Sequence, residues 1–388
     1  MKKVLIILPT LQYGGGIVSG IKNMLPLLPS DNYEISILSL EYSYTEKVEL
    51  DNCKILDDNI FLLTLTSNYF QFKESKYRLL VFLIKSILNF LQIISLKYSF
   101  ENWLFKKISL LYVGYDIVVA YSEGVVTRFC QYIEAPHKIA WIHCDYAERM
   151  KNIRYNEENI YMKYNHIVCV SRYTLQNFKQ IYPKLSEKSI YIYNLLNKNY
   201  IKYQATEDCN LKEESKIKIL SIGRIAQVKQ FHLIPSIISK MIQLGTKNFK
   251  WYLIGEGASE EVLRLQSELN HYNISDDYFS YLGPKCNPYP YIKNSDILVS
   301  TSSSEACPFV VNEARVLGVP VVSNKYKSIY EFISDNINGR ICSIDEMAEI
   351  LSELVLNPNE LKRLKEGMGI DDYNNDVIVQ NIVELFEK

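Results

Sequence analysis

The sequence lacks an excess of charge of either sign. Its 43 Lys and Arg residues are balanced by 44 Asp and Glu residues, so the net charge at neutral pH is −1. The electrostatic field of such a small net charge gives no basis for non-specific binding to nucleic acid. The sequence also has no stripe of basic residues that alternates with aromatic residues. Nucleic acid is therefore not an expected partner.

Closely spaced cysteines are also missing. The eight cysteines are scattered along the chain, and no two of them form a Cys-x-x-Cys pair. This spacing signals neither a zinc site nor a disulfide framework. It predicts reduced thiols in a cytoplasmic protein.

Long uninterrupted apolar runs are scarce. The N-terminal MKKVLIILPT is too short for a signal peptide and meets a glycine turn, so we interpret it as a first buried strand. The apolar stretch 79–96 is interrupted by Lys85, Asn89 and Gln92, which would be costly in the middle of a bilayer. A membrane span is therefore disfavoured. A buried helix and a helix lying on the inner face of the cytoplasmic membrane remain alternatives.

The chain does contain enough apolar sequence for large cores. Hydrophobic residues make up 48% of its 388 residues, and this length predicts two domains because one core stops growing near roughly 250–300 residues. Short Val- and Ile-rich runs alternate with helix-like stretches in both halves, which is typical of parallel sheets covered on both faces. The runs are 4–8, 35–40, 117–120, 138–142, 167–170, 190–193, 217–222, 251–254, 279–282, 297–300 and 321–323.

A polar stretch at 197–214 separates the two series of strands and predicts a linker. We therefore expect an α/β protein with two Rossmann-like doubly wound domains, at 1–196 and 215–370. Residues 371–388 are predicted to end the chain in an amphipathic helix.

The first motif with chemical meaning is the glycine run 14–16, directly after the first strand. Glycine lets the backbone approach a phosphate, and the following helix start offers free N–H groups, so Gly15 and Gly16 are candidate ligand-binding residues. The spacing up to Gly20, with Glu41 after the second strand, also fits a nicotinamide dinucleotide site. An NAD-dependent sugar oxidoreductase and a plain tight turn therefore remain alternatives.

The second motif, residues 221–229, follows the first strand of the second half. Arg224 and Lys229 are five residues apart beside Gly223, so both can reach one diphosphate, the arginine as a fork of donors and the lysine as a point charge. Open α/β sheets bind ligands at the carboxyl ends of their strands, which favours a ligand over solvated surface charge here.

The third motif is residues 302–314, SSSEACPFVVNEA. Its two carboxylates, Glu305 and Glu313, are eight residues apart, the first in a loop and the second about a turn into a helix. Carboxylates bind the hydroxyl groups of a sugar and a ribose, and the N–H groups of Phe309 and Val310 would face a diphosphate between them. For the two glutamates alone, a helix cap and a solvated face would be the alternative.

This string closely resembles the retaining glycosyltransferases of family 4, of the bacterial polysaccharide-biosynthesis type, which have the GT-B fold of two Rossmann-like domains facing across a cleft. The resemblance covers nearly the whole chain and is strongest over 217–325. It implies that Glu305 contacts the transferred sugar and that Glu313 binds ribose hydroxyls. It also implies that Arg224 and Lys229 bind the diphosphate.

Further residues enter through the same resemblance. The turns at Gly223, Gly255 and Pro284 are expected to line the nucleotide pocket. The segment 141–146, WIHCDY, is similar to the family's histidine segment, which makes His143 a donor-sugar contact near the reacting carbon. The sequence departs from the family pattern at Ala306, where a glycine is usual.

The resemblance implies transfer of a hexosyl group, with retention, from a UDP- or GDP-sugar to a glycan or lipid-linked acceptor, as in capsule or O-antigen synthesis. We expect the first domain to hold the acceptor and the second the donor. The fold also implies that the helix at 371–388 packs back on the first domain. No cofactor or divalent metal is expected, because Arg224, Lys229 and the helix start would neutralise the leaving diphosphate. A nucleotide-sugar epimerase on the same fold and a non-catalytic sugar-binding relative remain alternatives.

Overall fold

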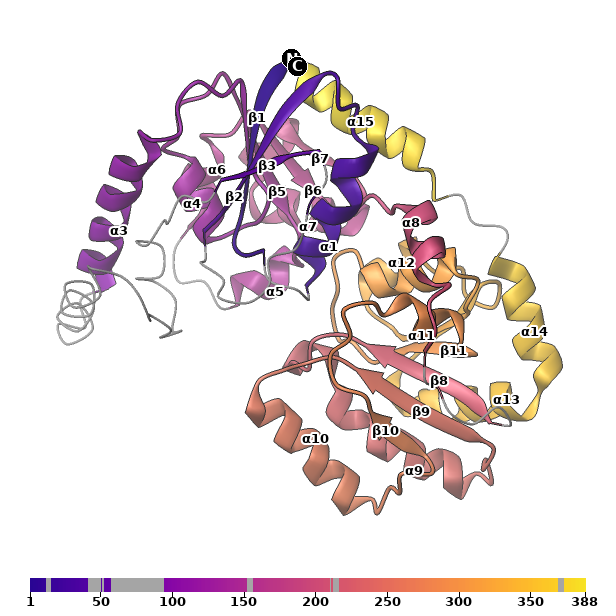
Figure 1. Ribbon diagram of the computed structural model, residues 1–388. Helices are drawn as coiled ribbons and strands as arrows, with labels where there is room; N and C mark the ends of the chain where they lie inside the picture. The colour runs from indigo at the N-terminus through magenta and orange to yellow at the C-terminus, as the bar shows by residue number, and fades with distance from the viewer. Residues whose placement is uncertain are drawn as a thin grey trace.

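The computed structural model of the chain describes residues 1–11, 15–40, 50, 52–56, 94–151, 156–209, 211, 216–368 and 373–388. They form two α/β units, each built around a parallel sheet with helices packed on it (Figure 1). The predicted class, two Rossmann-like doubly wound units, is confirmed. Three buried clusters fill the cores, and one of them joins residues of both units, such as Ile6 and Val311.

The N-terminal sheet has seven strands in the order β3-β2-β1-β4-β5-β6-β7. The strand order reverses between β1 and β4, and ligands bind at such switch points in open α/β sheets. The strands are β1 (Lys2–Leu8), β2 (Tyr33–Ser39), β3 (Lys54–Leu56), β4 (Ile117–Ala120), β5 (His137–Ile142), β6 (His166–Cys169) and β7 (Ser189–Tyr191). The helices that accompany them are α1 (Gly16–Met24), α3 (Ile94–Ser109), α4 (Val125–Cys130), α5 (Tyr146–Met150), α6 (Glu158–Tyr161) and α7 (Arg172–Ile181).

The C-terminal sheet repeats this plan with six strands in the order β10-β9-β8-β11-β12-β13. Its switch point lies between β8 and β11. The strands are β8 (Ile217–Ile222), β9 (Phe249–Ile254), β10 (Phe279–Tyr281), β11 (Ile297–Ser300), β12 (Val321–Asn324) and β13 (Gly339–Cys342). The main helices are α9 (Ile234–Gln243), α10 (Ser259–His271), α11 (Tyr289–Lys293), α12 (Phe309–Val316), α13 (Met347–Leu356) and α14 (Pro358–Gly367).

The stretch predicted as a linker lies between β7 and β8, the strands that end one sheet and begin the other, and it contains a helix that the sequence did not predict, α8 (Lys198–Gln204). The side chain of Asn197 accepts a hydrogen bond from the N–H of Tyr200 and thereby caps the helix start. The helix packs on α11 and α12 of the C-terminal unit. Ile201 is its one fully buried side chain, so its sequence is polar and shows no apolar periodicity from which a helix could be predicted.

The last helix, α15 (Asn375–Glu387), packs on the N-terminal unit, where it lies close to β1 and brings the two chain ends together (Figure 1). Lys2 forms an ion pair with Glu387 at 2.9 Å. The ring of Phe386 is buried and meets the ring of Tyr33 edge-on at 5.4 Å. The helix therefore holds the C-terminal end of the chain against the N-terminal sheet.

Replacing Phe386 with leucine is expected to lower the free energy of unfolding by about 1–2 kcal/mol, because it removes the edge-on ring contact and leaves part of the site unfilled. Urea titration followed by circular dichroism measures this. Val377 in the same helix is 50% exposed, so Val377→Ala is the matched control and is expected to change stability by less than about 0.5 kcal/mol. Equal losses in the two variants would contradict the packing described.

Most of the apolar stretch 79–96 lies outside the described residues. Among the helices that the structure does describe, none is long and apolar enough to cross a membrane.

Candidate functional site

The loops that follow the strands of the two sheets meet at their carboxyl ends. On the C-terminal side, the loop after β11 carries Ser304, whose hydroxyl donates a hydrogen bond at 3.0 Å to Asp145, which follows β5. At the start of α1, a Cβ atom on Gly16 would lie 3.5 Å from the ring of Phe309 in α12. The two switch points therefore lie on facing edges.

Lys229 and Glu305 are brought together at this edge although they are 76 residues apart in the chain. The Lys229 ammonium and a Glu305 carboxylate oxygen form an ion pair, and the side chains are 21% and 19% exposed. The hydroxyl of Ser302 donates to the same carboxylate oxygen at 2.8 Å. The hydroxyl of Thr301 donates to the backbone carbonyl of Lys229 at 2.6 Å, which fixes the two loops to each other.

Two predicted glycines make room for this arrangement. A Cβ atom on Gly255 would lie 1.9 Å from the carbonyl oxygen of Gly223, closer than any side chain can come. A Cβ atom on Gly223 would lie 3.4 Å from Cε of Lys229. The structure thus supplies a packing reason for Gly255, and its place in a nucleotide pocket stays a prediction.

Two other predicted residues lie on the open side of the same edge. Arg224 is exposed, and among the described residues no carboxylate pairs with it. Pro284 is also exposed and follows Gly283, whose carbonyl accepts a hydrogen bond from the N–H of Gly255 at 3.1 Å. Both side chains are therefore accessible to a ligand.

Glu313 has a different environment from that of Glu305. It lies one turn into α12, as predicted, and is only 6% exposed. The hydroxyl of Tyr289 donates to its carboxylate at 3.3 Å. Burial penalises the charged form and raises the pKa of Glu313 to about 7.

The first residues of α12 are Phe309 and Val310, as the sequence predicted, and Pro308 is the residue before the helix. Their N–H groups have no partner within the helix, and the helix dipole places partial positive charge there. A Cβ atom on Gly20 would lie 3.3 Å from the Phe309 ring, so α1 and the start of α12 are in close contact. Gly15 precedes α1 and adopts a φ of 157°.

The other features of the nicotinamide alternative cannot be placed, because Gly14 and Glu41 lie outside the described residues. Among the residues that are described, no cluster of three or more His, Cys, Asp or Glu could hold a metal ion.

His143 follows β5 and is held by its neighbours. Its backbone N–H donates to a carboxylate oxygen of Glu123 at 3.1 Å, and its ring lies 4.6 Å from that of Tyr121. Burial lowers the pKa of His143 to about 3, so the imidazole is neutral at physiological pH. Its Nε2 atom is buried without a hydrogen-bond partner among the described residues, an arrangement that is uncommon in proteins.

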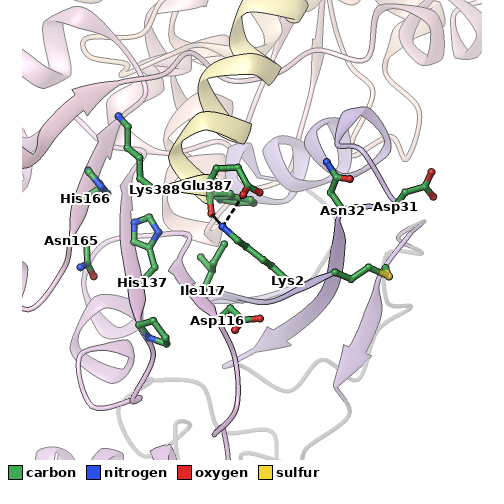
Figure 2. Close-up of a pocket in the computed structure, with 13 residues that line it drawn as sticks. Lys2, Asp31, Asn32, Asp116, Ile117, His137, Asn165, His166, Glu387 and Lys388 are labelled. Carbon is green, nitrogen blue, oxygen red and sulfur yellow. Dashed lines mark hydrogen bonds and ion pairs between the residues drawn. The ribbon is translucent and has the colours of Figure 1, made fainter.

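A pocket of about 850 Å³ lies at the opposite end of the N-terminal sheet (Figure 2). It is lined by residues near the beginnings of strands, including Lys2, His137 and His166, and by the end of α15. The rings of the two histidines are 5.1 Å apart, and burial together with nearby cations lowers the pKa of His137 to about 4. Ligands of open sheets bind at the other edge, so this pocket is separate from the candidate site.

Comparison with known families concerns the C-terminal unit. Residues 204–368 match the family described as glycosyl transferases group 1. This part of the chain is a group 1 glycosyltransferase domain. It includes Arg224, Lys229, Glu305 and Glu313. The family predicted from the motifs is thus confirmed at the level of group 1.

Curated relatives match about half of the chain at low identity. An uncharacterized 41.2 kDa protein in the cps region of Klebsiella pneumoniae is 24% identical over 192 residues, which are 48% of this chain and 51% of that protein. The N-acetylgalactosamine-N,N'-diacetylbacillosaminyl-diphospho-undecaprenol 4-alpha-N-acetylgalactosaminyltransferase of Campylobacter jejuni is 28% identical over 188 residues, 48% of each chain. The chain spans about half the length of the curated relatives it matches.

Solved structures match over the whole chain. HepE of Anabaena in complex with UDP and glucose has a TM-score of 0.73 at 14% identity and covers 100% of both chains. TarM has a TM-score of 0.71 at 15% identity, covering 100% of this chain and 99% of that one. WaaG, a glycosyltransferase involved in lipopolysaccharide biosynthesis, has a TM-score of 0.65 at 11% identity, with 99% of each chain covered. At such identities the likeness shows the fold, and the predicted GT-B fold is confirmed.

Sequence reasoning gave no role to two residues that hold the glutamates, Ser302 and Tyr289. A serine three residues before Glu305 in one loop was a usable signal, because short side chains at that spacing commonly bond. No such signal existed for Tyr289, which lies 24 residues from Glu313.

Proposed function

We propose that this protein transfers a hexosyl group from a nucleoside-diphosphate sugar to a glycan or lipid-linked acceptor in cell-surface polysaccharide synthesis, with retention of configuration. The observation that carries the proposal is the Lys229–Glu305 pair at the carboxyl edge of the glycosyltransferase domain, next to the loop that leads into α12. The relative from a cps region and the relative named as a transferase to a diphospho-undecaprenol substrate support the acceptor class. The UDP bound to HepE supports a UDP-sugar donor.

The proposed roles follow from charge and hydrogen-bonding capacity. Lys229, Arg224 and the N–H groups at the start of α12 stabilise the leaving diphosphate, a contribution that grows as the sugar–phosphate bond breaks. Glu305 accepts hydrogen bonds from hydroxyl groups of the transferred sugar, and Glu313 accepts them from the ribose. In this proposal the fixed cationic groups take the place of a divalent metal. The anomeric configuration is retained by a front-face route, in which the acceptor hydroxyl approaches the sugar on the side from which the diphosphate leaves.

His143 is proposed to contact the donor sugar near the reacting carbon. Because its imidazole is neutral, it can exchange hydrogen bonds with a sugar hydroxyl but adds no positive charge to the site. A ligand hydroxyl within reach of Nε2 would supply the partner that this buried atom lacks among the described residues.

A thermal-shift screen tests the proposed function. UDP, GDP, ADP, CMP and their common sugar conjugates are compared with NAD and NADP on the wild-type protein and on Glu313→Ala. We expect one nucleoside diphosphate to raise the melting temperature of the wild-type protein and not that of the variant. A shift with NAD or NADP alone would favour the oxidoreductase. Release of an epimerised sugar without any acceptor would favour the epimerase.

We also propose that the N-terminal unit contacts the inner face of an anionic membrane through the end of α3. Lys106 and Lys107 lie in the last turn of this helix, and apolar side chains with basic neighbours are suited to an anionic lipid surface. The exposed apolar side chains there are Trp103 (55%), Leu110 (63%), Leu111 (73%) and Val113 (63%). Such a surface would bring a lipid-linked acceptor to the cleft.

Flotation with vesicles that contain phosphatidylglycerol tests this contact. Replacing Leu110, Leu111 and Val113 together with serine is expected to lower the vesicle-bound fraction about fivefold or more, because each change removes apolar surface that would enter the headgroup region. Leu263 in α10 is 62% exposed on the C-terminal unit, so Leu263→Ser is the matched control and should float like the wild-type protein. Unchanged flotation of the triple variant would remove the basis for the contact.

A further inference from the structure

The loop that carries Glu305 is tied to the N-terminal unit through the preceding residue. The Ser304 hydroxyl donates a hydrogen bond at 3.0 Å to Oδ2 of Asp145. Asp145 lies two residues after His143, beyond the end of β5. This hydrogen bond therefore crosses from the glycosyltransferase domain to the unit proposed to hold the acceptor.

Hydrogen bonds from its own unit orient the Asp145 carboxylate independently of Ser304. Its Oδ1 atom accepts from the N–H of Ala147 at 3.0 Å and from the Asn177 amide at 3.0 Å. Its Oδ2 atom accepts from the Tyr173 hydroxyl at 3.2 Å. Because all three donors belong to α5 and α7, the carboxylate forms a fixed acceptor at the edge of the N-terminal unit.

A second polar contact between the units lies at the same turn of α7. The two carboxylate oxygens of Glu331 accept from the N–H groups of Arg172 at 2.9 Å and Tyr173 at 2.7 Å. These N–H groups are free at a helix start, where the dipole favours a negative charge. Tyr173 therefore faces the C-terminal unit through its backbone and supports Asp145 through its hydroxyl. The first turn of α7 is a docking point for the other unit.

Within its own domain the Glu305 loop is held by two serines. Ser302 donates to the Glu305 carboxylate, and Ser328 donates to its backbone carbonyl at 2.6 Å. The hydrogen bond from Ser304 adds a restraint that exists only when the two units are close. A restraint of this kind can couple the placement of Glu305 to closure of the cleft.

We propose that Asp145 is a positioning residue for sugar transfer, which receives Ser304 across the closed cleft and so sets the loop that presents Glu305 to the donor sugar. The inference rests on the proposed function. It matters for rate because a small misplacement of a reacting group can cost up to about 10²-fold in turnover.

The decisive comparison is between neighbouring serines. Ser304→Ala is expected to lower kcat roughly tenfold, measured as release of the nucleoside diphosphate from the donor found by the screen. The Kd for that nucleoside diphosphate should change less than about twofold. Ser303 is exposed, and its hydroxyl donates at 3.2 Å to the carbonyl of Val228 in the same domain. Ser303→Ala is therefore the matched control and should keep the wild-type kcat.

Asp145, which accepts the hydrogen bond from Ser304, allows a second test. Asp145→Ala should lower kcat at least as much as Ser304→Ala, and adding Ser304→Ala to it should cause no further loss if the two residues act through one contact. Independent losses that multiply in the double variant would overturn the proposal. So would a kcat for Ser304→Ala equal to that of Ser303→Ala.

Amide hydrogen exchange gives a readout that does not need turnover. Peptides covering 302–308 should exchange faster in Ser304→Ala than in Ser303→Ala, because the loop loses its contact with the N-terminal unit. Equal exchange in the two variants would overturn the proposal. A wild-type protein that binds no nucleoside diphosphate and releases none from any sugar conjugate of the screen would instead overturn the proposed function, so the two failures are distinguishable.

Discussion

Replacing Lys229 with alanine is expected to lower kcat for sugar transfer by roughly 10²–10³-fold, the size of effect seen when one fixed group that stabilises developing negative charge is removed. Lys229 already lies against Glu305, so its ammonium is placed where the sugar and the diphosphate would join. Its restricted exposure strengthens this effect because less water screens the charge. Initial rates with the donor found by the screen measure it.

A lysine of the same domain provides the control for this change. Lys240 forms an ion pair with Glu349 at 2.6 Å on the outer helices, and both side chains are about half exposed. Exposed pairs contribute little, so Lys240→Ala should keep the wild-type kcat and nearly the wild-type melting temperature. If folded Lys229→Ala retained more than about a tenth of the wild-type kcat, the proposed role of Lys229 at the diphosphate would be wrong.

Lowering the pH from 8 to 6 is expected to weaken donor binding about tenfold, because burial raises the pKa of the Glu313 carboxyl to about 7. In the proposed role, only the ionised carboxylate would accept hydrogen bonds from both ribose hydroxyls. Titration calorimetry with the intact nucleoside-diphosphate sugar measures this. The sugar ester is preferred to the free nucleotide because a terminal phosphate itself titrates near pH 6.

Glu313→Gln separates this residue from other titrating groups. The variant should bind the donor at least about tenfold more weakly at pH 8, and its affinity should no longer depend on pH between 6 and 8. His143 and His137 do not interfere, since burial lowers their pKa values to about 3 and about 4. A pH dependence that persists unchanged in Glu313→Gln would assign the titration to another group.

The raised pKa of Glu313 also affects stability. Its effect on stability has the opposite dependence on pH from its effect on donor binding. Because burial raises the pKa of Glu313 from 4.5 to about 7, the folded protein holds this proton more tightly than the unfolded chain. The contribution of Glu313 to the free energy of unfolding is therefore fully present below about pH 4.5 and lost as the pH rises through about 7. Glu313→Gln should remove this loss, so the variant should gain stability relative to wild type at pH 8 while losing donor affinity.

Much of the fold could be predicted from apolar periodicity. The strands at 117–120, 217–222 and 297–300 begin and end where the apolar runs do, because such runs are stable only when both sheet faces are covered. The strands β3 and β13 were missed for identifiable reasons. The first is a three-residue edge strand, and the second begins at Gly339, which lies so close to Val321 that a Cβ atom would be 2.4 Å from its carbonyl oxygen.

The sequence by itself determined the two parallel sheets, since local pattern specifies them. It also placed Arg224, Lys229 and Glu305 in the segments that follow strands, and Glu313 one turn into a helix. Only the tertiary structure decided which of these side chains meet. The pairing of Lys229 with Glu305 joins loops 76 residues apart.

The same holds for the environment of each side chain. The raised pKa of Glu313 depends on burial beneath distant segments, and the contact of Ser304 with Asp145 spans 159 residues. Periodicity along the chain states which face of an element is apolar. It does not state which distant element covers that face, and that choice sets the partners, the local dielectric and the charge of the site.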